Sequence, residues 1–144
     1  MIAVDTNILI YAHRADSAFY TAARACMNRL LSSRALWALP WPCLHEFFSI
    51  TTHPRIYKPA STPAMAMEQI DVWLESPGLV LMAESPAHWP TLKRLLSQAK
   101  LSGPAVHDAR IAALCLQHGV SEFWSADRDF NRFPSLKVVN PLVG

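Results

Sequence analysis

Short apolar runs alternate with longer segments of helical periodicity along the chain, and proline or glycine separates most of them. Five of these runs are too short for helices and are typical of buried strands. They comprise residues 2–4, 36–39, 79–82, 123–124 and 137–139. Strands that alternate with helices in this way predict an α/β fold, in which helices cover both faces of a parallel sheet.

The segments between the strands carry the start and stop signals of helices. Thr6 and Asn7 are capping residues before a helix over residues 8–12. Thr62 followed by Pro63 is a strong start for another helix, because proline fits the first helical position. Further helices are expected over residues 18–31, 62–76, 85–99 and 104–118, with one more that ends near residue 52.

The composition predicts a single domain that spans residues 1–144. Hydrophobic residues make up 51% of the chain and charged residues only 17%, which excludes a disordered protein. The longest apolar stretches are far shorter than the ~20 residues of a membrane-spanning helix, so no membrane association is expected. Three cysteines with apolar neighbours are typical of reduced thiols in a cytoplasmic protein: Cys26, Cys43 and Cys115.

Two acidic residues follow predicted strands, where a parallel α/β sheet binds its ligands. Asp5 ends the first strand and Asp127 follows the fourth. Taken singly, each is better explained as a helix cap or a turn residue. Taken together, they place two carboxylates at the predicted crevice.

Two further acidic residues lie on helices with apolar neighbours. Glu46 belongs to a helix with few charges. Asp108 shares a helical stripe with Ala112 and Cys115, whereas Arg110 lies on the opposite side of that helix. We therefore expect Glu46 to lie on an unsolvated face and the Asp108 stripe to face inward. Carboxylates in such places require a partner or a shifted pKa.

Four carboxylates in one crevice repel one another and favour a bound cation. Carboxylate oxygens are the ligands that Mg²⁺ prefers, and no histidine or cysteine spacing indicates zinc. Two such ions can activate a water molecule and stabilise the leaving oxygen of a phosphodiester, as in nucleases. Paired acids also serve phosphatases and phosphate-receiver domains, so spacing alone leaves these alternatives open.

The acidic residues and the segments around them resemble a PIN domain. The segment Met1–Asn7 contains Asp5, and Ser125–Phe130 contains Asp127; Glu46 and Asp108 lie between them in the order of that family. The similarity is closest to the ribonuclease toxins of VapBC toxin–antitoxin modules and covers nearly the whole chain. It implies a three-layer fold, with a central parallel five-stranded sheet that helices flank.

The resemblance also implies an activity, a cofactor and partners. It implies a cytoplasmic endoribonuclease toxin that hydrolyses RNA phosphodiester bonds with Mg²⁺ or Mn²⁺. Its implied partners are a cognate VapB-type antitoxin, which inhibits it, and a second copy of the chain in a homodimer. Residues 8–12 and 19–31, with Phe47 and Phe48, are candidates for a groove that takes an amphipathic antitoxin helix.

The resemblance assigns roles to individual residues. It makes the four acids catalytic metal ligands and Asp129 a further metal contact, with Asn7 and Ser125 orienting the carboxylates. Ser125 stands where the family often has threonine, which keeps the hydroxyl. The four acids are Asp5, Glu46, Asp108 and Asp127.

Other residues are candidates for contacts with RNA. His107 adjoins Asp108, but adjacent residues on a helix point in different directions, so His107 is expected to line the rim of the crevice or to pack. Arginines close in sequence to the acids are candidates for phosphate binding, although each taken singly is better explained as a solvated surface residue: Arg110, Arg128 and Arg132, with Arg14 after the first helix. Three aromatic residues are candidates for stacking on unpaired bases, although tryptophans in so apolar a chain are more often core or interface residues: Tyr11, Trp41 and Trp124.

Two rival functions use the same fold. A phosphatase or phosphotransferase of the haloacid dehalogenase type needs Asp-x-Asp after the first strand, and Asn7 takes the place of its second acid. A non-catalytic PIN-like binding module has no need of all four acids. The sequence therefore favours the nuclease over both.

Overall fold

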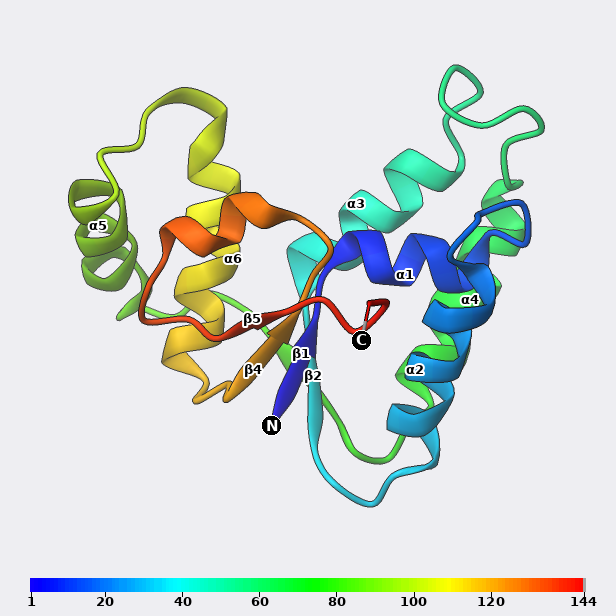
Figure 1. Ribbon diagram of the computed structural model, residues 1–144, viewed down its shortest axis with the longest axis horizontal. Coiled ribbons are helices and arrows are strands. Elements are labelled where there is room, and N and C mark those ends of the chain that lie inside the picture. The colour runs from blue at the N-terminus through cyan, green and yellow to red at the C-terminus, as the bar shows by residue number, and fades with distance from the viewer. Residues whose placement is uncertain (144) are drawn as a thin grey trace.

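Five parallel strands form one central sheet in the computed structural model, which describes residues 1–143 (Figure 1). The strands are β1 (Ile2–Val4), β2 (Trp37–Pro40), β3 (Leu79–Met82), β4 (Glu122–Trp124) and β5 (Val138–Val139). They lie in the order β3-β2-β1-β4-β5, and every neighbouring pair is parallel. Each strand begins and ends within one residue of a predicted apolar run, so the predicted parallel sheet is confirmed.

Six α-helices complete a three-layer arrangement. They are α1 (Thr6–His13), α2 (Tyr20–Ser32), α3 (Trp41–Thr51), α4 (Pro63–Leu74), α5 (His88–Gln98) and α6 (Val106–Gln117). Two short 3₁₀ helices, η1 (Gly103–Ala105) and η2 (Arg128–Arg132), precede α6 and follow β4. Figure 1 shows α1–α4 on one side of the sheet and α5 and α6 on the other. Within residues 1–143, no helix is both long and apolar enough to cross a membrane.

The core lies where the helices meet the two faces of the sheet. Trp37 and Phe123 on the strands, Phe47 on α3 and Leu114 on α6 are almost completely buried. Burial of each such side chain contributes about 1.5–3 kcal/mol. The three cysteines are buried and free, as predicted.

Two predicted helix starts differ in their outcome. Thr62 caps α4 as predicted, because its hydroxyl accepts a hydrogen bond from the Met65 amide at 3.1 Å. The prediction that Thr6 and Asn7 cap the first helix is wrong. Asp5 is the cap, and its Oδ1 accepts from the Thr6 amide at 2.8 Å. The helix begins one residue after β1 because this carboxylate satisfies the first exposed amide.

The strand order places the site at the centre of the sheet. β1 is paired with β2 on one side and β4 on the other, so the order of connections reverses at β1. Ligands of open α/β sheets bind beyond the carboxyl ends of the strands at such a point. Asp5 directly follows β1, and Ser125 directly follows β4. The topology therefore places Asp5, which lies near the start of the chain, beside Ser125, which lies near its end.

Candidate active site and metal centre

The Asp5 carboxylate is buried and fixed by four donors. Its Oδ1 accepts from the Thr6 amide at 2.8 Å and from the Cys43 thiol at 3.7 Å. Its Oδ2 accepts from the Ser125 hydroxyl at 2.7 Å and from the Asn7 side-chain amide at 3.2 Å. Only 4% of Asp5 is exposed to solvent. These four hydrogen bonds fix the orientation of the Asp5 carboxylate at the end of β1.

The electrostatic surroundings of Asp5 oppose its ionisation. Burial raises the pKa of Asp5 to about 6, although the Ser125 hydroxyl and the Thr6 amide act in the opposite direction. The negative charges of Glu46 and Asp127 raise this pKa further. An ionised Asp5 therefore gains from any positive charge placed among these acids.

A cavity of about 150 Å³ brings the four predicted acids together. Asp5 follows β1, Glu46 projects from α3, Asp108 from α6, and Asp127 follows β4. Thr6 and Asn7 also line it, and its apolar wall consists of Ile10, Ile50, Ile111 and Phe130. Residues far apart in the sequence thus place their carboxylates around one small space.

Asp108, Asp127 and Asp129 form the outer part of this cluster. Each offers a carboxylate oxygen, and the three oxygens lie within 4.8 Å of one another. Asp127 directly precedes η2 and caps it, because its Oδ1 accepts a hydrogen bond from the Asp129 amide at 2.9 Å. The side chain of Asp129 is 66% exposed, so this residue lies at the rim of the site.

The acids contributed by the helices also carry raised pKa values. Burial raises the pKa of Asp108, and the charge of Asp127 adds to the shift, while Arg132 opposes it. Burial likewise raises the pKa of Glu46, and the Asp108 charge adds to it. The prediction that Glu46 lies on an unsolvated face is wrong, since the residue as a whole is exposed. Its position on α3 faces the open mouth of the site rather than the core.

The donor set fits a hard divalent cation. All the ligand atoms around the cavity are oxygens, which Mg²⁺ and Mn²⁺ prefer. Thr6 also lines this cavity, and its hydroxyl is buried beside Glu46. No basic side chain lines the cavity within residues 1–143, so the charges of its four carboxylates favour a bound cation.

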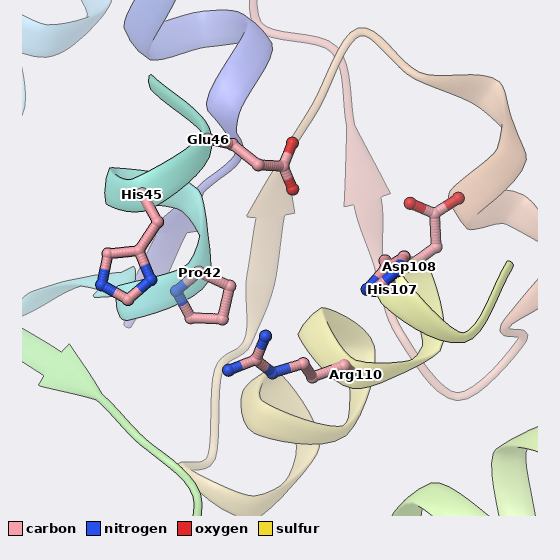
Figure 2. Close-up of a pocket in the computed structure, with 6 residues that line it drawn as sticks. All are labelled: Pro42, His45, Glu46, His107, Asp108 and Arg110. Carbon is pink, nitrogen blue, oxygen red and sulfur yellow. The ribbon is translucent and has the colours of Figure 1, made fainter. Parts of the chain in front are cut away.

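A second, larger cavity of about 440 Å³ adjoins the first between α3 and α6 (Figure 2). Glu46 and Asp108 line both cavities. The other lining residues are Pro42, His45, His107 and Arg110, so His107 lies at the rim as predicted.

The structure corrects the position of Arg110. The sequence placed it on the side of the helix opposite Asp108, yet it lines the same cavity and pairs with Glu84. The reason is the length of the side chain, which reaches the cavity from a different side of α6 than Asp108. Figure 2 shows Arg110 extending from α6 toward Pro42 at the start of α3.

The remaining basic candidates differ in their surroundings. The Arg132 Nη2 lies 3.7 Å from Asp108 Oδ2 and 3.3 Å from Asp129 Oδ2. Arg128 is exposed and lines a cavity of about 210 Å³ together with Asp127. The candidacy of Arg14 is wrong. Its buried guanidinium is bonded to Asp16 beyond the far end of α1.

The three aromatic candidates for base stacking also differ in their surroundings. Trp124 is buried and its Nε1 donates to Glu122, so of its two interpretations the core role is the correct one and stacking on bases is excluded. Tyr11 packs against Phe19, with ring centroids 5.1 Å apart. Trp41 alone lies next to the site, where it stacks on His45.

The sequence interpretation missed two residues of the site. The Cys43 thiol donates to Asp5, and Thr6 lines the acidic cavity. Cys43 lies among apolar neighbours and Thr6 at a helix start, so both have ordinary structural explanations in the sequence. The spacing of Cys43, three residues before Glu46 on one helix, is the signal that could have found it.

Comparison with known proteins agrees with this geometry. The sequence profile of the PIN domain family matches residues 2–136. Ribonuclease VapC48 of Mycobacterium tuberculosis is 30% identical over 140 residues, which cover 97% of each chain. Ribonuclease VapC43 of the same organism is 32% identical over 144 residues, which cover all of this chain and 97% of that relative.

A solved structure shares the fold at lower sequence identity. The structure of VapBC2 from Rickettsia felis, bound to a DNA fragment from their promoter, contains a chain that superposes with a TM-score of 0.69. The two sequences are 19% identical, and the match covers 96% of this chain and 98% of the other. The profile, the relatives and the fold therefore lead to one conclusion: the chain belongs to the PIN domain family and, within it, to the VapC group.

Proposed function

We propose that this chain is the endoribonuclease toxin of a type II toxin–antitoxin pair, and that residues 1–144 act as one PIN-like domain. The two relatives that share 30% and 32% of its sequence are ribonucleases. The observation that carries the proposal is the convergence of Asp5, Glu46, Asp108 and Asp127 on one cavity. RNA is the substrate, and its phosphodiester bond is hydrolysed at these acids.

The carboxylates would hold the divalent cation, Mg²⁺ or Mn²⁺, that this reaction requires. Asp5 and Asp108 would bind it directly, and Glu46 and Asp127 would bind it directly or through water. Asp129 contributes from the rim, where its carboxylate adjoins those of Asp108 and Asp127. Such a cation lowers the pKa of a bound water and stabilises negative charge on a phosphoryl oxygen.

Ser125 and Asn7 position the acids. The Ser125 hydroxyl donates to Asp5 at 2.7 Å and accepts from the Asp127 amide at 3.0 Å, so one side chain connects two ligands. Asn7 donates to Asp5 and accepts from the Ala126 amide at 3.1 Å. Both residues tie the end of β4 to the start of α1, which keeps the carboxylates in place before the substrate binds.

Arg128 and Arg132 bring the phosphates of RNA to this acidic site. Arg132 pairs with Asp108 and Asp129, where its charge offsets part of the repulsion between the acids. Arg128 is exposed beside Asp127. A phosphate that approaches the cation meets these two guanidinium groups, which donate to phosphate oxygens without reading the base.

A VapB-type antitoxin is the proposed partner that inhibits the chain. Several large apolar residues of the groove that the sequence suggested are in the core, since Ile8, Leu9 and Phe47 are fully buried. Apolar surface also lies over α2 and α4, where Leu31 and Val72 line a cavity of about 110 Å³. This surface is better suited to an amphipathic helix.

Two further proposals concern the assembly and its location. A homodimer is proposed, as in the family that the sequence resembles. A cytoplasmic location is proposed because the three cysteines are buried and free, which suits a reducing compartment.

Cleavage of RNA by the purified chain tests the proposal. We expect cleavage with Mg²⁺ or Mn²⁺, none with a chelator, and a loss of more than about 100-fold in the Asp108→Asn variant. Asp71→Asn is the matched control, because Asp71 is an exposed acid on α4 outside the site. Cleavage that survives chelation or the Asp108→Asn change contradicts the proposal.

The same preparation separates the rival functions. Hydrolysis of a phosphomonoester such as p-nitrophenyl phosphate, without cleavage of RNA, favours a phosphatase. Binding of RNA without hydrolysis of either substrate favours a binding module.

A further inference from the structure

The cavity between α3 and α6 differs in chemistry from the acidic cavity that it adjoins. Its volume is about 440 Å³, within the range of roughly 300–1,000 Å³ that is typical of small-molecule sites. One end carries Glu46 and Asp108, which it shares with the acidic cavity, and the rest carries His45, His107 and Arg110. It is therefore large enough for a nucleotide and connects directly to the site of hydrolysis.

The rings of His45 and Pro42 line one part of this cavity. The His45 imidazole stacks on the Trp41 indole, with ring centroids 6.1 Å apart and an interplanar angle of 30°. The pyrrolidine ring of Pro42 lies beside His45 and adds an apolar surface (Figure 2). Unpaired bases of RNA stack on such surfaces, because every base has a π-face.

Arg110 presents directed donors rather than a free positive charge. Its Nε donates to the Glu84 carboxylate, which neutralises the guanidinium and fixes its plane. Its two terminal amino groups have no hydrogen-bond partner within residues 1–143, and the side chain lines the cavity. The planar fork of these amino groups matches two adjacent acceptors on a base edge.

We infer that this cavity binds the unpaired nucleobase next to the scissile phosphate, and that it prefers guanine. The base stacks on the His45 face, and the terminal amino groups of Arg110 donate to guanine O6 and N7, the commonest bidentate arginine contact with a base. The inference rests on the proposed ribonuclease function, since it assigns a neighbouring subsite to the same substrate. It also changes the role predicted for Arg110 from phosphate binding to base recognition.

Sequencing of the cut sites in an RNA library with a randomised segment tests this subsite. We expect the wild type to favour guanine at one position next to the cut. Arg110→Ala and Arg110→Lys should both reduce that preference about 10-fold or more, because lysine keeps the charge but lacks the planar fork. His45→Ala should raise KM about 10-fold through the loss of stacking. Arg94→Ala and His53→Ala, at exposed positions away from the cavity, are the matched controls.

A binding experiment keeps the inference testable without cleavage. Guanosine 5′-monophosphate should shift the NMR signals of the His45 imidazole and bind at least about 10-fold more tightly than cytidine 5′-monophosphate, and Arg110→Ala should abolish the difference.

The outcomes separate the subsite from the proposed function. Cleavage of RNA with the same base profile in the wild type, Arg110→Ala and Arg110→Lys overturns the subsite and leaves the ribonuclease intact. Selective guanine binding by a wild type that cleaves no RNA supports the subsite and overturns the ribonuclease. Equal binding of the two nucleotides overturns the subsite.

Discussion

Raising the pH from about 4.5 to about 7 without divalent cations should destabilise the protein, because the buried Asp5 must ionise. Its pKa is about 6 in the folded chain, against 3.8 for an ordinary aspartate. Between these two values the folded state binds more protons than the unfolded state. The free energy of unfolding therefore falls as the pH rises through this interval.

The size of the effect follows from that difference in pKa. A difference of roughly two pH units corresponds to about 3 kcal/mol over the whole titration, at about 1.4 kcal/mol per unit, and about 2 kcal/mol of this falls between pH 4.5 and 7. Glu46 and Asp108, whose pKa values are also raised, change the stability in the same direction. Asp16 and Glu84 have lowered pKa values, so their contribution is lost only as the pH falls below about 4.5.

Urea denaturation at a series of pH values, in the presence of a chelator, measures this slope. At pH 7, a divalent cation at a hundred times its dissociation constant should restore about 2.7 kcal/mol. Asp5→Asn should flatten the slope between pH 4.5 and 7. A wild-type stability that is constant or increases over this interval refutes the reasoning, as does an equal slope in the variant.

Three other substitutions have defined outcomes. Ser125→Ala should weaken cation binding about 10–100-fold by calorimetry, whereas Ser125→Thr should retain it, because only the hydroxyl connects Asp5 to the Asp127 amide; equal affinities would contradict this role. Phe130→Ala should lower the free energy of unfolding by about 3–5 kcal/mol in urea, since the ring is buried in the core, and a loss below about 1 kcal/mol would count against it. Arg14→Ala should lower the free energy of unfolding by about 1–3 kcal/mol but leave the rate of RNA cleavage unchanged. A slower rate of cleavage would show that Arg14 takes part in the site.

The sheet could be predicted from the sequence because its strands are buried and apolar. The runs around Ala3, Ala38 and Phe123 contain almost no polar residue, and each is bounded by a polar residue, proline or glycine. Parallel topology then sends the carboxyl ends of β1 and β4 to one edge of the sheet. Asp5 and Asp127 could be placed together for that physical reason alone.

The other half of the site could not be derived in this way. Glu46 and Asp108 lie on helices from opposite sides of the sheet, and only the packing of α3 and α6 brings them to one cavity. The resemblance to a known family supplied that juxtaposition. A helical projection also misplaced Arg110, because it treats a long, flexible side chain as a point on the helix surface.

One residue can serve both as a structural cap and as part of a site, although the sequence interpretation treated these roles as alternatives. Asp5 was weighed as either a helix cap or a ligand, yet one carboxylate caps α1 and lines the acidic cavity. Phe47 was expected in a partner groove because it is large and apolar, but it is fully buried against Trp73. Apolar character alone does not distinguish a core residue from an interface residue.

The location of a bound cation tests the account most directly. Crystals soaked in Mn²⁺ would reveal the ion by its anomalous scattering. The account predicts a peak in the cavity between Asp5, Glu46, Asp108 and Asp127, and its loss in Asp108→Asn crystals. A cavity without a peak at saturating Mn²⁺, or a peak only at unrelated carboxylates, would contradict it.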